Sequence, residues 1–340
     1  DPADKADAQG RKAVRTALKP APQRTIGGSL NYDTSFGIGV QAFWENRNYT
    51  KRGDLLRAEA SVWQDLQEVI AKYRLPFAFG RDVDFIAQAG AVYQNTDAYE
   101  LEAARAAAGI EYRFSPRWSF TAQGTAEGGR AKPPDEPRRT YMMLGLPLGA
   151  NYSSANSLLD ATRGSRMLFN LTPYNGFYDG NFTALRSRLD LQHFQPLVGE
   201  DTLVLALRAS LGGLWGADSQ AVPPSIRFYS GGGGSVRGYK YQSLGPRDSD
   251  NDPLGGKALL EVSVEPRWKL SEEWGLVAFL DGGMIYDDFK DYGRDMRWGA
   301  GVGARYYTVI GPVRFDVATP LNPRDDDDTL QFYISIGQSF

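Results

Sequence analysis

The chain has 340 residues, of which 42% are hydrophobic, and its mean hydropathy is −0.42. No stretch of about 18 uncharged apolar residues occurs, which excludes an α-helical membrane protein. The net charge of −3 gives no basic footprint for nucleic acid, and the absence of cysteine excludes disulfides and thiolate metal sites. A membrane β-barrel is compatible with these values, because its strands alternate lipid-facing and lumen-facing residues and the average conceals both.

The N-terminal segment, residues 1–23, differs from the rest of the chain. It is rich in Ala, Lys and Arg between residues 4 and 18 and closes with two prolines, a composition that could form a short helix. We expect a solvated linker or a short helix here. The residues after Asp1 show neither the positively charged region nor the apolar region of a signal peptide. We therefore expect either that a signal peptide has been removed or that the sequence is a fragment.

From residue 24 to residue 340 the sequence alternates strand-like runs with turn residues, and we predict sixteen strands. They fall near residues 25–32, 36–44, 54–64, 67–77, 83–95, 100–114, 118–128, 139–152, 165–174, 181–195, 202–215, 256–270, 273–287, 296–309, 311–321 and 329–340. Lengths of about 10 residues exceed those of most soluble strands and match tilted membrane strands. The sequence therefore predicts an all-β fold, a sixteen-stranded antiparallel transmembrane β-barrel.

Alternation of apolar and polar residues is clearest near the C-terminus. In the twelfth strand, Leu260, Val262 and Val264 share one face, and Glu261 and Glu265 share the other. In the last strand, the apolar face carries Leu330, Phe332, Ile334, Ile336 and Phe340. We expect this last row to face lipid and to form a targeting signal that the cell's own barrel-insertion machinery recognises.

Connection lengths separate a membrane barrel from a soluble β-sandwich, whose strands also alternate but with the apolar face inward. Every second connection is tight, such as residues 115–117 and 198–201, whereas the others include long polar segments, such as 132–138 and 216–255. Short turns on one side and long loops on the other are typical of outer-membrane barrels. We therefore expect the bacterial outer membrane as the location.

The connection between strands 11 and 12, residues 216–255, is far longer than an ordinary hairpin loop. Bulky residues flank four consecutive glycines, Gly231 to Gly234, which indicates a packed segment with a tight bend. The glycines are followed by the run Val236, Arg237, Gly238 and Tyr239.

The run at residues 236–239 resembles the loop signature of the BamA/TamA outer-membrane assembly superfamily. The wider run from 222 to 246 resembles TamA-type members in particular, as does the end of the chain at residues 330–334. Residues 279–283 resemble the motif of the superfamily's strand 13. The resemblance covers residues 24–340, and we expect the family's periplasmic POTRA domains to be absent from this chain, with the N-terminal linker on the periplasmic side.

By this resemblance, the loop folds back into the lumen, where its Arg237 meets an acidic residue on the inner wall. The alternation of the strands supports this independently, because Asp281, Glu261 and Glu265 all fall on inward faces. A guanidinium group in a narrow lumen needs a carboxylate, which it contacts with two parallel donors. We predict that Arg237 pairs with Asp281, with Glu261 or Glu265 as secondary partners; the alternative is a solvated loop residue.

The junction of strands 1 and 16 forms the seam of the predicted barrel. Gly27 and Gly28 lie in the first strand and Gly337 in the last, and glycine weakens a strand and packs little. We expect a weak seam that opens sideways into lipid.

By resemblance, the function is the assembly or insertion of proteins, autotransporters in particular, into the outer membrane by strand templating or bilayer thinning at the seam. The implied partners are the lipid bilayer, unfolded outer-membrane clients and a TamB-type periplasm-spanning protein. The resemblance also implies an aid to lipid transfer between membranes. A passive pore and a two-partner-secretion transporter remain alternatives, since either would use the lumen itself.

Other chemistry has little support in the sequence. The spacing from Gly233 to Gly238 fits a phosphate loop, but Tyr239 replaces the required lysine. His193, the single histidine, falls on the lipid side and suits no Ser–His hydrolase. The acidic run at residues 325–328 lacks the glycine and glutamate of a known calcium loop. We expect a protein that is not an enzyme and that uses no metal or cofactor.

Overall fold

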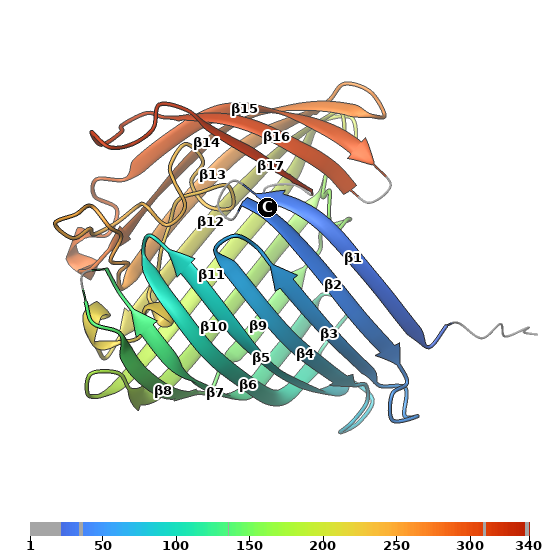
Figure 1. Ribbon diagram of the computed structural model, residues 1–340. Coiled ribbons are helices and arrows are strands. Elements are labelled where there is room, and N and C mark those ends of the chain that lie inside the picture. Colours follow the sequence, from blue (N-terminus) through green and yellow to red (C-terminus); the bar gives the residue numbers. More distant parts are fainter. Residues whose placement is uncertain (1–21, 34–36, 135, 309–310, 337–339) are drawn as a thin grey trace, which may run out of the picture.

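The computed structural model describes residues 22–33, 37–134, 136–308, 311–336 and 340. Within this part of the chain, seventeen strands form one sheet that closes into a barrel (Figure 1). The strands are β1 (Arg24–Asp33), β2 (Gly37–Arg47), β3 (Leu55–Val62), β4 (Leu66–Leu75), β5 (Val83–Thr96), β6 (Tyr99–Arg113), β7 (Trp118–Lys132), β8 (Arg139–Gly145), β9 (Leu148–Ser153), β10 (Gly164–Phe177), β11 (Asn181–Val198), β12 (Leu203–Trp215), β13 (Ala258–Lys269), β14 (Trp274–Tyr286), β15 (Arg297–Thr308), β16 (Gly311–Pro320) and β17 (Gln331–Ile336). In the described residues, no helix is long and apolar enough to cross a membrane. The linker expected at residues 1–23 lies outside the described part except for its last two residues.

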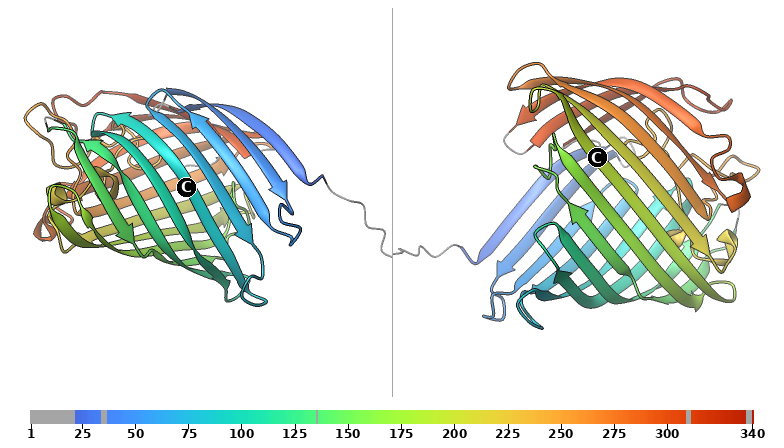
Figure 2. Two further views of the ribbon diagram at one scale, coloured as in Figure 1. Left: turned by 60° about the horizontal axis from the view of Figure 1, so that its bottom comes forward. Right: turned by 180° about the vertical axis from the view of Figure 1, so that it is seen from behind.

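The wall is antiparallel throughout, with β1 and β17 at the two ends of the ladder (Figures 1 and 2). The eighth predicted strand is divided into β8 and β9, which both pair with β7 on one side and β10 on the other. Pro147 lies between them and has no N–H to give to the ladder. This proline explains why seventeen strands are found where sixteen were predicted.

The predicted alternation of the strands is confirmed. On β13, Val264 and Trp268 point outward with 43% and 55% of their surface exposed, whereas Glu265 and Arg267 point into the lumen and are buried. The β13–β14 ladder skips Glu265 and Pro266, because proline cannot donate a hydrogen bond. The inner wall thus has a local irregularity beside a buried carboxylate.

The expected difference between short and long connections holds for much of the chain. The connections after β7, β12, β14 and β16 are long, and those after β6, β11 and β13 are tight. Elsewhere in the first half the order reverses, since residues 63–65 and 97–98 form tight turns while residues 76–82 and 154–163 form longer loops. The rule is therefore not followed at every hairpin.

The glycines of the first strand are packed in different ways. A Cβ added to Gly27 would lie 2.4 Å from the ring of Phe43 on β2, so this glycine makes room for an aromatic side chain. The guanidinium carbon of Arg57 lies 4.0 Å from the centre of the same ring. Gly27 is therefore needed for packing against β2, and this contact does not bear on the expected weakness of the junction with the last strand. Gly337, the glycine expected on the other side of the seam, lies outside the described residues.

We predict that Gly27→Ala destabilises the folded barrel by about 1–3 kcal/mol, because its methyl group displaces the Phe43 ring. Gly124→Ala is the matched control, since a Cβ at Gly124 has no neighbour within 4 Å. Urea unfolding followed by the gel mobility of unheated samples measures the difference. Equal urea midpoints for the two variants would show that the packing of the Phe43 ring does not require glycine at position 27.

Candidate functional site

The segment between β12 and β13, residues 216–257, is here called the lumen loop. It contains two short 3₁₀ turns, η1 (Ser219–Ala221) and η2 (Pro224–Ile226). Backbone bridges join Phe228 to Gly256 and Ser230 to Leu244, so the loop is tied to itself. The lumen loop is therefore an ordered, packed segment, as its bulky residues indicated.

Glycines on both the loop and the wall allow their backbones to approach closely. Gly238 has a φ of +100°, and a Cβ there would lie 3.0 Å from the carbonyl group of Thr319 on β16. A Cβ at Gly299 on β15 would lie 1.9 Å from the carbonyl oxygen of Arg237. A Cβ at Gly283 on β14 would likewise collide with Val236. These glycines bring the 236–239 motif against the wall.

Arg237 is the centre of the contact between loop and wall. Its Nε donates to Oδ2 of Asp281 at 2.7 Å and its Nη2 donates to Oδ1 at 3.0 Å, which is a two-pronged pair. Its Nη1 donates to Glu265 at 2.6 Å and to Asp316 at 3.0 Å. Its guanidinium carbon lies 3.4 Å from the ring centre of Phe279. The side chain of Arg237 is only 2% exposed, so all of its charge is neutralised by protein groups.

The carboxylates around Arg237 are themselves held by further side chains. The hydroxyl of Ser263 donates to Asp281 at 2.6 Å, and Nε of Arg267 donates to Glu265 at 2.8 Å. Arg305 and Arg314 flank Asp316. We call this set the charge node: Arg237, Arg267, Arg305, Arg314, Glu265, Asp281 and Asp316. A buried charge is tolerated only when it is paired and hydrogen-bonded, and the node meets that condition for its carboxylates.

The pKa of Arg237 is raised above its ordinary value. Burial alone lowers this pKa, because it disfavours the charged form, but attraction from Asp281, Glu265 and Asp316 outweighs burial. Arg237 therefore stays charged at every pH at which the protein is folded, and the docking of the loop does not depend on its protonation.

The structure brings together two of the three predicted acidic partners of Arg237. Asp281 and Glu265 contact it, as expected. Glu261 does not: it accepts hydrogen bonds from the loop hydroxyls of Ser230, at 2.7 Å, and Ser235, and its other oxygen lies 3.5 Å from Arg208. Glu261 thus binds the loop through its serines.

Sequence reasoning missed several residues of the site, among them the arginines that hold the carboxylates, Asp316 and Tyr333. Asp316 points into the lumen from β16, between the outward-facing Phe315 and Val317, and this alternation was a usable signal. Tyr333 on β17 accepts a hydrogen bond from the backbone N–H of Gly238 at 3.0 Å and donates to the carbonyl oxygen of Tyr239 at 3.1 Å. The last strand therefore supports the loop directly.

The opposite side of the lumen loop reaches the first half of the barrel. The hydroxyl of Ser225 donates to Glu127 on β7 at 3.0 Å. The rings of Tyr229 and Tyr99 lie 5.5 Å apart. The loop consequently crosses the lumen and contacts both halves of the wall.

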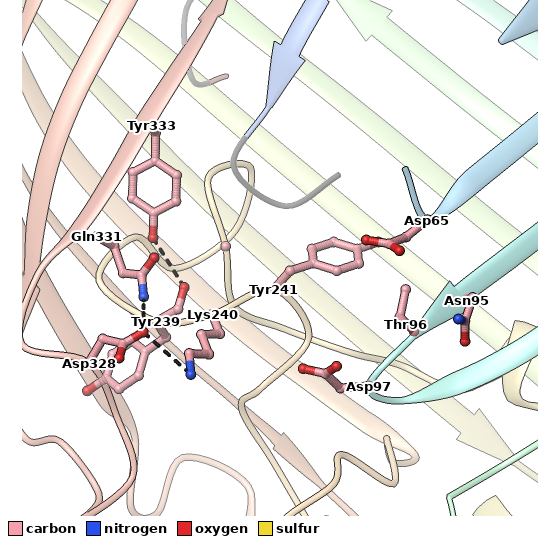
Figure 3. Close-up of a pocket in the computed structure, with 11 residues that line it drawn as sticks. Asp65, Asn95, Thr96, Asp97, Tyr239, Lys240, Tyr241, Asp328, Gln331 and Tyr333 are labelled. Atoms are coloured by element: carbon pink, nitrogen blue, oxygen red, sulfur yellow. Dashed lines mark hydrogen bonds and ion pairs between the residues drawn. The ribbon is translucent and has the colours of Figure 1, made fainter. Parts of the chain in front are cut away.

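A polar cavity of about 430 Å³ remains beside the loop (Figure 3). It lies between the loop residues Lys240 and Tyr241, the tight turns after β3 and β5, and the start of β17. Nζ of Lys240 lies 3.5 Å from Asp328 at its edge, and Tyr241 projects toward Asp65 (Figure 3). The loop therefore fills only part of the barrel's mouth.

The expected lipid-facing position of Phe340 is wrong. Leu330, Phe332 and Ile334 point outward with 52%, 49% and 40% of their surface exposed. Phe340 instead lies inside, where its ring is 6.5 Å from that of the buried Phe194 on β11. Phe340 therefore does not continue the outward row, and the side chain of Ile336 lies outside the described residues.

Residues 48–340 match the model of the Omp85 superfamily domain, and the chain belongs to this superfamily. The chain is similar to the outer membrane protein assembly factor BamA of Nitratidesulfovibrio vulgaris, 33% identical over 126 residues, which are 35% of this chain and 16% of the relative. It is 29% identical over 181 residues to BamA of Neisseria meningitidis, which are 43% of this chain and 23% of the relative. The matched regions therefore span less than a quarter of these relatives.

Solved structures show the same fold. The crystal structure of BamA from Haemophilus ducreyi lacking POTRA domains 1–3 superposes with a TM-score of 0.82 at 19% identity, over 99% of this chain and 74% of that one. CdiB from Acinetobacter baumannii superposes with a TM-score of 0.62 at 15% identity, over 99% of this chain and 65% of that one. The chain is thus a β-barrel of the bacterial outer membrane.

We predict that Arg237→Ala releases the lumen loop while the barrel stays folded. Removing one partner from a buried ion pair costs about 3–5 kcal/mol, because the remaining charges are left unpaired. Limited proteolysis within residues 216–257 should become much faster, and the gel mobility of unheated protein should not change.

Arg237→Lys serves as the graded comparison, since lysine keeps the charge but cannot make the two-pronged contact with Asp281. We expect an intermediate cleavage rate for this variant. If Arg237→Ala left the loop as resistant as the parent protein, the charge node would not be what holds it.

Proposed function

We propose that this chain is the membrane-embedded part of an assembly factor that inserts proteins into the outer membrane through the seam between β1 and β17. The observation that supports this proposal is that, among the described residues, each of these two strands has a regular ladder on one side only. Among the described residues, no register joins β1 to β17, whereas β1 pairs with β2 over ten residues and β17 pairs with β16 over six. An unpaired strand edge in hydrocarbon leaves N–H and C=O groups without partners, so such a junction invites another strand.

The lumen loop supports a lateral route over a route through the barrel. It crosses the lumen and is held by the charge node on one side and by contacts such as Ser225 with Glu127 on the other. A substrate that passed through the lumen would have to break this node. A passive pore or a two-partner-secretion transporter predicts a large conductance in planar bilayers, whereas a docked loop predicts small and infrequent currents.

The more specific assignment rests on resemblance. The run at residues 222–246 resembles TamA-type members, which points to autotransporters as clients, to a TamB-type partner in the periplasm and to lipid transfer between membranes. The outward row of Phe332 and Ile334 on β17 fits a targeting signal for the cell's insertion machinery, although Phe340 does not join that row. Assembly assays with and without a TamB-type protein would separate this assignment from a BamA-like one.

We predict that locking the seam stops assembly. Cysteines introduced at Ser29 and Ser335 into this cysteine-free chain should form a disulfide where the register of the closed seam brings them together. Oxidation should abolish the insertion of client proteins by the full-length factor, and reductant should restore it.

The control places cysteines at Ala42 and Ala60, which are paired across the ordinary β2–β3 ladder. A disulfide there should leave assembly unchanged. Full activity of the oxidised seam variant would contradict the lateral route and would move the function to the lumen or to parts of the protein outside this chain.

A further inference from the structure

The outward face of strands β3 to β7 is hollowed near one rim of the barrel. This depression, here called the outer hollow, has a volume of about 740 Å³. One row of residues, paired from strand to strand, forms its apolar base: Ala60, Val69, Ala91, Ala104 and Gly128. Apart from Val69, these side chains are small or absent, so the wall is set back from the membrane at this place.

A polar row crosses the same strands beside the apolar base, closer to the rim. It consists of four residues that line the outer hollow and are paired in this order across β4, β5, β6 and β7: Gln67, Tyr93, Glu102 and Arg130. Charged side chains on the lipid-facing side of a barrel are tolerated near the membrane–water interface and are costly at its midplane. The polar row therefore lies at the level of the lipid head groups.

The length of the apolar surface on β6 agrees with this level. The outward residues that follow Glu102 are apolar, and the exposed ring of Tyr112 ends their row: Ala104, Ala106, Ala108 and Ile110. The path from Glu102 to Tyr112 covers about 34 Å along the strand, or about 25 Å of height at the usual tilt, which is the height of the apolar band of such barrels. Glu102 and Tyr112 thus mark the two membrane interfaces.

Two cationic groups at the head of the outer hollow have no carboxylate partner. Arg138 takes both acidic residues of β6 at this level, because its Nη1 donates to Glu102 at 3.1 Å and its Nη2 donates to Glu100. Arg130 and Lys132 lie on the outward face of β7 and are exposed, and the side chain of neither pairs with another residue in the described part of the chain. Cations above an apolar surface match an amphiphile that carries an anionic group above hydrocarbon chains.

The direction of β7 decides which leaflet the outer hollow faces. Strands alternate in direction from β1 to β7, so β7 ends at the rim opposite the one at which the chain enters the wall at Arg24. With the N-terminal linker on the periplasmic side, the outer hollow opens to the outer leaflet of the membrane.

We propose that the outer hollow binds a phosphorylated glycolipid of the outer leaflet. Arg130 and Lys132 bind a phosphate group, and an acyl chain lies along the apolar base. Gln67 and Tyr93 offer an amide and a hydroxyl group to the sugar, since both can donate and accept hydrogen bonds. This site goes beyond the proposed assembly function and does not depend on the lateral route.

The test measures lipid binding by the whole chain in detergent, with native mass spectrometry as the readout. The probes are lipid A with two phosphate groups, lipid A without phosphate, and phosphatidylglycerol. The double variant Arg130→Gln and Lys132→Gln should bind phosphorylated lipid A about tenfold more weakly or worse, because it loses charge-assisted contacts with the phosphate. Arg117→Gln is the matched control, since Arg117 is an exposed arginine just before β7 at the opposite rim.

A second variant fills the outer hollow without changing its charge. A Cβ at Gly128 would lie 3.6 Å from the carbonyl oxygen of Tyr141, which is ordinary contact, so Gly128→Leu should fold. We expect affinity for phosphorylated lipid A to fall about fourfold for each lipid methylene group that the leucine displaces. Gly124→Leu is the control, because Gly124 lies on the outward face of the same strand, outside the hollow and in open space.

The outcomes separate the parts of the proposal. Parent affinity in both the Arg130 and Lys132 double variant and Gly128→Leu would overturn the site. Equal binding of phosphate-free lipid A would overturn the role of the two cations, and equally tight binding of phosphatidylglycerol would overturn the assignment to a glycolipid. The gel mobility of unheated samples checks folding. No client protein takes part, so failure of this site leaves the lateral route standing, and failure of the assembly experiment leaves lipid binding measurable.

Discussion

The burial of one guanidinium group organises this barrel. Arg237 lies where water cannot solvate it, so three carboxylates from three different strands must converge on it. Those strands, β13, β14 and β16, are fixed relative to one another by the same contact that fixes the lumen loop. The charge node therefore ties a long connection to the second half of the wall, and the last strand joins this unit through the hydroxyl of Tyr333.

The first half of the barrel is joined to the loop mainly by apolar packing. Val222, Ile226 and Phe228 of the loop are buried in one cluster with wall residues that include Tyr99, Leu101, Tyr141 and Met143. A hydrogen bond from Ser225 to Glu127 adds to this packing, and a polar cavity remains at the rim. The loop therefore braces one half of the wall through charge and the other through apolar contacts.

Much of the fold could be predicted from the sequence, because strand faces repeat with a period of two and turn residues mark the strand ends. The same period identified Asp281 and Glu265 as inward residues. It could not show that Glu261 binds loop serines, since the choice among three inward acids depends on the path of the loop. It also failed for Phe340, whose ring packs against Phe194 on the inner wall. The role of Gly27 was hidden for a similar reason, since it depends on a ring from the next strand.

The central claim is that Arg237 and Asp281 act together to hold the loop. A double-mutant cycle with Arg237→Ala, Asp281→Ala and the combined variant tests it most directly, with amide hydrogen exchange of residues 228–244 as the measure of loop opening. The account predicts a coupling free energy of about 1–3 kcal/mol between the two substitutions. Additive effects, with no coupling, would contradict it.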